Sequence, residues 1–205
     1  AVSVIESGMK LYARHGRPIS GIEELMAVNL APESNYVLTC DIIIGEKSFI
    51  YEKDGSVLTD WRALGADAEY GFSGTFNGNG YAIRFSAVSE NTSGFGLFSR
   101  ISGTVFNLYC GASFVYSGTA GVTALGAFCS EVTATGRIIN CAGTLGSEIS
   151  VKAPGGMSAA GVIGVNYGEI DGFMAGAHAI INIETDAACS VGSFIGANYG
   201  RIANV

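Results

Sequence analysis

The sequence predicts an all-β fold, a solenoid of stacked parallel strands with a short capping α-helix at its N-terminal end. Composition is the first observation behind this prediction. The 205 residues include 30 glycines and 3 prolines, and 48% are hydrophobic. Only 14% are charged, against about 25% in an average chain. Many glycines among β-branched and aromatic residues are typical of short strands joined by tight turns.

An internal repeat is the second observation. A glycine, any residue and then Val or Ile recur with spacings of 33, 32 and 32 residues. The longest match pairs I-G-V-N-Y-G-E-I (163–170) with I-G-A-N-Y-G-R-I (195–202). Helical repeats of this period need two amphipathic helices per unit, and propeller blades need about 40–45 residues. Stacked strands, each pairing with its neighbours one repeat away, therefore fit best.

The repeat predicts which side chains stack. Alternation along a strand puts the apolar position inside and its neighbours outside. The expected inner ladders are Val105, Ile138, Ile170 and Ile202, and, approximately, Phe98, Phe128, Ile163 and Ile195. The expected outer ladder is Thr104, Arg137, Glu169 and Arg201.

Two regions are expected. Residues 1–34 form an N-terminal segment whose helix, over about 21–29, starts with a capping box from Ser20 to Glu23 and ends before Pro32. Its apolar stripe is Ile22, Leu25 and Met26. Residues 35–205 form the solenoid, with one strong strand over 36–44 and a polar excursion or loop over 45–70. We expect this region to be truncated at its C-terminal end, because G-R-I-A-N-V stops within a strand pattern.

Two Asn-Gly pairs stand back to back at 77–80. Each alone would predict a two-residue hairpin. The surrounding period instead favours a corner that leads into the first regular repeat, anchored by Phe72, Phe76 and Ile83. The stretch is no phosphate loop, because no Lys-Ser or Lys-Thr follows it. A strand rather than a helix follows as well, which excludes a dinucleotide fingerprint.

Few residues are candidates for chemistry. Glu169 and Asp171 are paired carboxylates on one strand, which we interpret as a solvated face beside Arg137 and Arg201. The excursion holds a second acidic group, Asp60, Asp67 and Glu69, for which a surface loop is the simpler interpretation. It also holds three aromatic residues that could stack on a carbohydrate, Trp61, Tyr51 and Tyr70. The only histidines, His15 and His178, have no recognisable nucleophile motif beside them.

No cofactor or metal is expected. The five cysteines lack zinc-site spacing, and most sit among apolar residues as small buried hydrophobes. An EF-hand would need more carboxylates and a closing Glu. The net charge of −7 argues against a nucleic-acid partner. The sequence has no run of about 18 apolar residues, so we expect no membrane insertion.

The stretch F-S-G-T-F-N-G-N-G-Y-A-I (72–83) resembles the F-x-G-x-F-D-G-N-G-H-x-I signature that opens GLUG-type repeat regions. Gly96-Leu97-Phe98 with residues 103–108 is similar to the G-L-F-G…G-x-I-x-N-L repeat that follows it, and residues 36–42 resemble its usual entry segment. The likeness covers most of residues 20–205, with Asn77 in place of Asp and Tyr81 in place of His.

This resemblance implies a right-handed parallel β-helix in a larger bacterial cell-surface or secreted protein. The expected role is non-catalytic, as an adhesin-like or structural display module; a polysaccharide-binding or polysaccharide-cleaving β-helix is the alternative. Some such regions accompany IgA-specific metallopeptidases, but this chain has no H-E-x-x-H. Expected partners are a host surface protein or glycan, and further repeats or another copy at the C-terminal coil. The residues expected to carry the repeat are Gly74, Phe76, Gly78, Gly80, Gly96, Phe98, Gly103, Val105, Asn107, Gly136, Ile138, Asn140, Gly168, Ile170, Gly200, Ile202 and Asn204.

Overall fold

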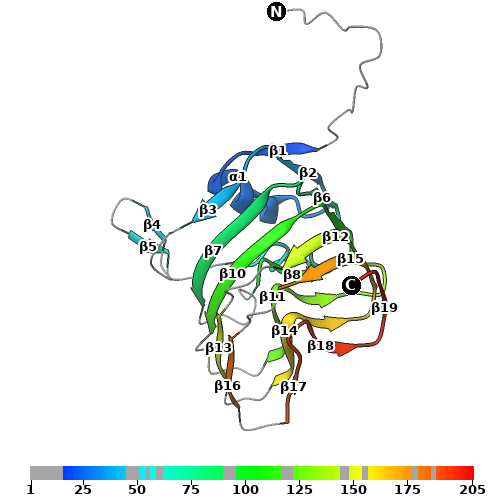
Figure 1. The fold of residues 1–205 in the computed structure, drawn as a ribbon. Helices are drawn as coiled ribbons and strands as arrows, with labels where there is room; N and C mark the ends of the chain where they lie inside the picture. The colour runs from blue at the N-terminus through cyan, green and yellow to red at the C-terminus, as the bar shows by residue number, and fades with distance from the viewer. Residues whose placement is uncertain are drawn as a thin grey trace, which may run out of the picture.

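The fold is known from a computed structural model, and its described part consists mostly of strands in parallel sheets with one short α-helix (Figure 1). The all-β prediction is confirmed at that level. Every strand pair among the described residues is parallel except the hairpin of β4 (Tyr51–Lys53) and β5 (Ser56–Leu58). The residues that the structure describes are 16–44, 51–53, 56–58, 62–89, 96–116, 122–143, 148–153, 157–176, 180–185 and 188–205.

Seven strands pair one after another in what we call the first stack. Each repeat adds one strand to the stack, and we call that contribution a rung. The register aligns one inward residue per rung, from Tyr36 through Phe76 and Val105 to Ile202. The strands, in order of pairing, are β1 (Arg17–Ile19), β2 (Asn35–Leu38), β6 (Thr75–Asn77), β9 (Thr104–Phe106), β12 (Arg137–Gly143), β15 (Glu169–Ala175) and β19 (Arg201–Ala203).

Two further stacks follow the same rule. The second stack joins the first where β10 meets β12, and Figure 1 shows β7 and β10 lying side by side. It comprises β3 (Ile42–Ile44), β7 (Ala82–Ser89), β10 (Tyr109–Tyr116), β13 (Glu148–Ala153) and β16 (Ile180–Thr185). The third stack comprises β8 (Phe98–Ile101), β11 (Val122–Val132) and β14 (Met157–Asn166), with β17 (Ser190–Val191) and β18 (Ile195–Asn198) both paired to β14.

The repeated glycines of the first stack are explained by close approach of neighbouring rungs. The carbonyl of Gly136 accepts a hydrogen bond from the Glu169 amide at 3.0 Å, and that of Gly168 accepts one from Arg201 at 2.8 Å. A Cβ on Gly168 or on Gly200 would overlap the carbonyl oxygen of the preceding glycine in the ladder. Glycine is therefore required at these positions, because a side chain would collide with the backbone of the neighbouring rung.

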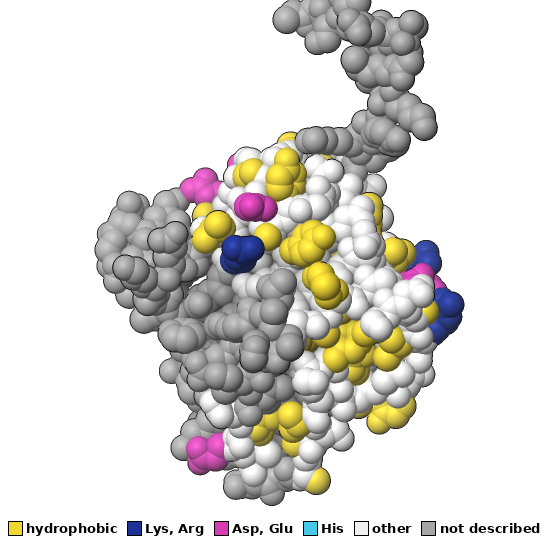
Figure 2. Space-filling model, viewed as in Figure 1, with side chains coloured by type: hydrophobic (Ala, Val, Ile, Leu, Met, Phe, Trp, Pro, Cys, Tyr) yellow, Lys and Arg dark blue, Asp and Glu magenta, His cyan; other side chains and the backbone are white. Residues whose placement is uncertain are grey.

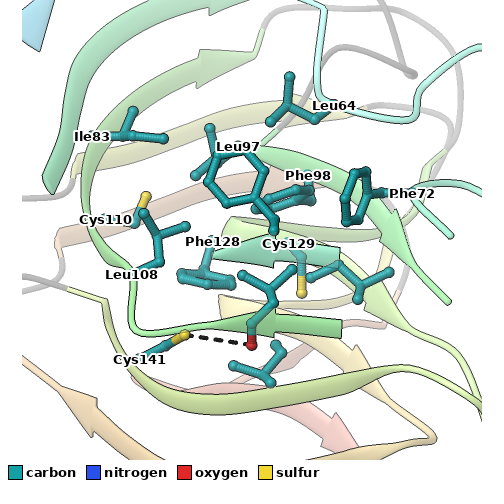
Figure 3. Packing of buried hydrophobic residues seen from close by; sticks show 14 of the residues in the cluster. Leu64, Phe72, Ile83, Leu97, Phe98, Leu108, Cys110, Phe128, Cys129 and Cys141 are labelled. Atoms are coloured by element: carbon teal, nitrogen blue, oxygen red, sulfur yellow. Dashed lines mark hydrogen bonds between the residues drawn. The ribbon is translucent and has the colours of Figure 1, made fainter. Parts of the chain in front are cut away.

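The core is one cluster in which aromatic rings run along the stacking direction. Phe98 lies between Phe76 and Phe128, with ring centroids 5.5 Å and 6.1 Å away. Phe128 then meets Phe173 at 5.4 Å, edge to face. All four rings are buried (Figure 3 labels Phe98 and Phe128). Large rings on successive rungs thus fill the interior that the small Gly and Ala residues leave.

One predicted ladder, which was expected only approximately, is wrong at Phe128, whereas Ile163 pairs with Ile195 as predicted. Phe98 pairs with Cys129 and not with Phe128, and Cys129 in turn pairs with Ile163. The register shifts in β11 between Gly126 and Cys129, which inserts one extra residue relative to β14. Such a bulge moves all later side chains of β11 by one position relative to its neighbouring strands. The ladder of Val105, Ile138, Ile170 and Ile202 lies as predicted.

The helical segment runs slightly later than predicted. The α-helix α1 (Ile22–Met26) continues as the 3₁₀-helix η1 (Ala27–Leu30), and it ends before Pro32 as expected. The capping box is wrong, because Gly21 is the N-cap residue and no side chain caps the helix. The buried face includes Leu25 and Val28, whereas Met26 is 39% exposed.

The single strand predicted over 36–44 is in fact two strands, β2 and β3. Between them the Thr39 amide donates to the carbonyl of Ile19, and the Asp41 carboxylate accepts from the Ala82 amide at 2.8 Å. These bonds hold a corner between the first and second stacks. The predicted polar excursion contains the β4–β5 hairpin and a bridge from Leu64 to Phe98.

The Asn-Gly pairs form a corner and not a hairpin, because β6 pairs with β2 and β9 while β7 pairs with β3 and β10. Asn79 and Gly80 have φ of 53° and 80°, the left-handed region that both residue types tolerate. Gly78 has a different reason, since a Cβ there would overlap Asn107 and Leu108 of the next rung. Gly80 therefore provides the left-handed backbone of the corner, whereas Gly78 allows the next rung to approach closely.

Candidate functional site

The outer ladder of Thr104, Arg137, Glu169 and Arg201 lies in register, as predicted. Arg137 Nε donates to Glu169 Oε2 at 2.9 Å, and Arg201 Nη1 donates to Glu169 Oε1. Figure 2 shows an acidic group between two basic ones at the edge where Figure 1 places β12, β15 and β19. Each oxygen of the Glu169 carboxylate thus binds one guanidinium group.

The second carboxylate of the predicted pair, Asp171, is also engaged by a neighbouring rung. Its Oδ1 accepts a hydrogen bond from Asn204 Nδ2 at 2.6 Å. Glu169 and Asp171 therefore each bind side chains of the rungs beside them. This agrees with the interpretation of the pair as part of a solvated face. A glycoside-cleaving pair instead needs one acid free to protonate the leaving group and one carboxylate free to act on the sugar.

The acidic group predicted in the excursion is only partly described. Asp67 pairs with Arg62 at 2.5 Å, and the carbonyl oxygen of Glu69 accepts from Arg100 at 3.2 Å. Tyr70 is exposed. Other residues of the predicted group lie outside the described part, namely Asp60, Trp61 and the side chain of Tyr51. The two histidines, His15 and His178, which were considered separately, also lie outside it.

Asparagines form ladders that the sequence reasoning did not assign. Asn107, Asn140 and Asn204 adopt φ near 50°, and Gly172 takes the equivalent place with φ of 67°. Asn140 Nδ2 donates to Asn107 Oδ1 at 2.7 Å. The sequence signal for this left-handed backbone was the Asn or Gly found two residues after each inward apolar residue, because these residue types best tolerate that conformation.

A second ladder lies at the turn before each outer charge. Asn166, which is buried, donates from Nδ2 to Asn198 Oδ1 at 2.7 Å and accepts from the Gly168 amide at 3.1 Å. Next to this pair the rings of Tyr167 and Tyr199 stack, with centroids 5.2 Å apart and planes 12° apart. The identical Asn-Tyr-Gly in two copies was the signal for both contacts.

The cysteines are held as thiols. Burial raises the pKa of Cys110 and of Cys141 to about 12, and it raises the pKa of Cys129 well above 9.0. Figure 3 shows these three side chains among the aromatic and aliphatic core residues. Because the thiolate is the reactive form, these cysteines behave as buried hydrophobes, which agrees with the sequence-based interpretation.

The described residues contain no group of three or more His, Cys, Asp or Glu side chains placed to bind a metal ion. No helix in the described part of the chain has the length and apolar content needed to cross a membrane. Comparison of the chain with protein-family models, with curated proteins and with solved structures gave no match.

Proposed function

We propose that this chain is a non-catalytic, right-handed parallel β-helical segment of a larger bacterial cell-surface or secreted protein, where it acts as an adhesin-like or structural display module. The observation that carries the proposal is the stacking of one short strand per repeat on each of three faces, with inward apolar and outward polar ladders. A module of this kind presents a long outer surface while each rung contacts only its neighbours.

The β-helical path follows from how the three stacks are connected. The chain passes from the first stack to the second through a corner, from β6 to β7 and again from β9 to β10. It then enters the third stack, as from β10 to β11, before it returns to the first stack at β12. Parallel strands joined in this cyclic order are favoured in the right-handed sense.

One observation supports a non-catalytic role. Glu169 and Asp171, the paired carboxylates on the outer face, are bound by Arg137, Arg201 and Asn204. The resemblance to GLUG-type repeats supports the surface location and the display role. Side chains of the outer ladder bind equivalent residues on neighbouring rungs and so specify the strand register. The stacked rungs are then available to support loops that bind a partner.

The location is tested on the bacterium that carries the chain. We expect antibodies raised against the purified chain to label intact cells or the culture medium, and external protease to remove the cell-associated signal. Labelling only after cell lysis would refute the surface assignment. Adhesion is tested by incubating fluorescent beads coated with the chain on host cells, with beads carrying heat-denatured chain as the control.

The alternative is a polysaccharide-binding or polysaccharide-cleaving β-helix, favoured by the exposed, stacked rings of Tyr167 and Tyr199. A glycan array tests binding, and the variant Tyr199→Ala then shows whether this pair contacts the sugar. Cleavage is tested by the release of reducing ends or unsaturated products. Release that is lost in a Glu169→Gln, Asp171→Asn variant would overturn the non-catalytic proposal.

A further inference from the structure

The outer face of the second stack carries large apolar side chains that are exposed. Ile43 on β3 is 58% exposed, and Tyr109 on β10 is 43% exposed. The face continues through β12 to β15, where Met174 is 62% exposed. Figure 2 shows hydrophobic side chains, with acidic and basic ones among them, over the region where Figure 1 places β3, β7 and β10. An exposed apolar patch with polar residues around it marks an interaction site.

Strand pairing arranges the outward residues of this face in two parallel rows. Side chains two residues apart on a strand point to the same face. The Asp41 carboxylate accepts a hydrogen bond from the Ala82 amide at 2.8 Å, which fixes Asp41 beside Ala82. Along one row lie Ile43, Arg84 and Gly111, and along the other lie Asp41, Ala82 and Tyr109.

The two rows form a self-complementary pattern. Adjacent strands lie about 4.8 Å apart, and alternate residues of one strand about 6.6 Å apart. A line from Ile43 to Tyr109 therefore crosses the two rows diagonally. Asp41 lies on one side of this line and Arg84 on the other. The face thus has an apolar diagonal flanked by one negative and one positive charge.

We propose that a second copy of the chain packs on this face about a two-fold axis close to the line from Ile43 to Tyr109. The axis lies in the plane of contact, so Asp41 of each copy faces Arg84 of the other. Ile43 and Tyr109, which are near the axis, each meet their own counterpart. Such a contact is isologous, as in most symmetric dimers. The strands of the two faces then cross at near right angles, one of the two preferred arrangements of packed sheets.

The charges favour a second copy over another kind of partner. Asp41 and Arg84 are both exposed, and no ion pair joins either of them to another described residue. An acidic partner is repelled by Asp41 and a basic partner by Arg84, whereas a second copy provides an opposite charge for both. Tyr, Met and Arg are also residue types that are enriched in protein–protein interfaces.

Sedimentation equilibrium of the whole chain, at concentrations up to about 1 mM, tests the proposal. We expect the natural chain to form dimers. Asp41→Arg and Arg84→Glu each bring like charges together twice in a symmetric dimer, so each variant alone should associate at least about tenfold more weakly. An equimolar mixture of the two variants restores both opposite-charge contacts and should form heterodimers.

Three further variants separate the contact from effects on folding. Asp41→Arg also removes the hydrogen bond to the Ala82 amide. Asp41→Asn keeps an acceptor oxygen and removes only the charge, and it should still weaken the dimer. Ile43→Glu should prevent dimerisation, because it places two carboxylates beside the axis. The matched control is Val191→Glu, at a β-branched residue that is 54% exposed on β17 of the third stack, and it should dimerise like the natural chain. Far-UV circular dichroism checks that each variant is folded.

A natural chain that stays monomeric over the whole range would overturn the proposal. So would dimerisation that is unchanged in Arg84→Glu, Ile43→Glu or Asp41→Asn, because the contact would then lie elsewhere. A mixture of folded Asp41→Arg and Arg84→Glu chains that fails to associate would overturn the assigned pairing. The proposal does not rest on the cell-surface role, and its failure would leave the labelling result unaffected.

Discussion

A Cβ atom added to Gly168 would overlap the carbonyl oxygen of Gly136 on the preceding rung. That oxygen is held in place, because it accepts a hydrogen bond from the Glu169 amide at 3.0 Å. The same relationship links Gly200 to Gly168 and Gly103 to Gly74. Glycine recurs at this point of the repeat because successive backbones touch there.

We therefore expect Gly168→Ala to destabilise the fold by about 1–3 kcal/mol, the usual cost of forcing extra volume into a packed site. The neighbouring atoms include backbone oxygens of Gly136 and Thr133, which cannot move aside as a flexible side chain would. Urea unfolding followed by circular dichroism measures the change. The matched control is Gly80→Asn, where no atom lies within 4 Å of the added Cβ and Asn tolerates the positive φ. Equal losses in the two variants would refute the close-approach explanation.

The outer ladder should contribute little to stability in spite of its geometry. Glu169 binds Arg137 and Arg201, but both arginine side chains are at least half exposed. Exposed pairs are worth about 0.2–1 kcal/mol each and are screened by salt. We expect Glu169→Gln to lower the free energy of unfolding within that range per pair at low salt, and by less at high salt.

The control for this prediction is the same substitution in a chain that already carries Arg137→Gln and Arg201→Gln. There Glu169→Gln should have almost no effect, because the partners of the carboxylate are absent. An undiminished loss in that background would mean that Glu169 stabilises the fold by contacts other than the ladder. The comparison thus separates charge pairing from packing.

Spacing predicted part of the fold, and the reasons for its failures are physical. The row of Val105, Ile138, Ile170 and Ile202 follows from the recurring Gly-x-Val/Ile motif, because equivalent strands pair motif to motif. Phe128 fails because β11 contains an extra residue, which depends on backbone packing and leaves no mark in residue type. The capping box fails because Gly21 takes the N-cap place with an extended backbone, so Glu23 stands one residue too early.

The contacts between side chains of equivalent rungs were harder to predict than the rungs themselves. Asn140 and Asn107 were recognised as equivalent, but their hydrogen bond and shared left-handed backbone depend on coordinates. Tyr167 and Tyr199 likewise stand 32 residues apart in identical tripeptides, yet stacked rings follow only if the two turns have the same conformation. Equivalence in sequence therefore predicted proximity but not the kind of contact.

The buried thiols should make stability fall in alkaline solution. Burial raises the pKa of Cys110 and Cys141 from 9.0 to about 12 in the folded chain. Above pH 9.0 the unfolded chain loses these protons while the folded chain keeps them, so unfolding becomes more favourable. Stability from these groups is therefore complete below pH 9.0 and is lost progressively as the pH rises toward about 12.

Urea midpoints measured across this pH range test the prediction. We expect the alkaline loss to be smaller in Cys110→Ala, although that variant is less stable at neutral pH because it loses core volume. Cys40→Ser, at a partly exposed position, should keep the full pH dependence. An alkaline slope that is unchanged in Cys110→Ala would assign the pH dependence to other groups.

The Asn-Gly corner should resist deamidation in the folded chain. Deamidation begins when the amide nitrogen of the following residue attacks the Asn side-chain carbonyl carbon. In the structure the Gly78 amide donates to the carbonyl of Phe106 at 2.8 Å, and the Gly80 amide donates to that of Asn107 at 2.9 Å. Both attacking nitrogens are thus held by the next rung, and the corner cannot rearrange without breaking these bonds.

We expect peptide mapping by mass spectrometry to find deamidation at Asn77 and Asn79 many times slower in the folded chain than in urea at the same pH. Asn140, which precedes Cys141, serves as an internal reference, because a side chain on the following residue hinders the attack. If the rate of deamidation is limited by local opening of the corner, the destabilised variant Gly168→Ala should deamidate faster than the natural chain. Equal rates in folded and unfolded chain would show that the hydrogen bonds to Phe106 and Asn107 do not hold this corner in solution.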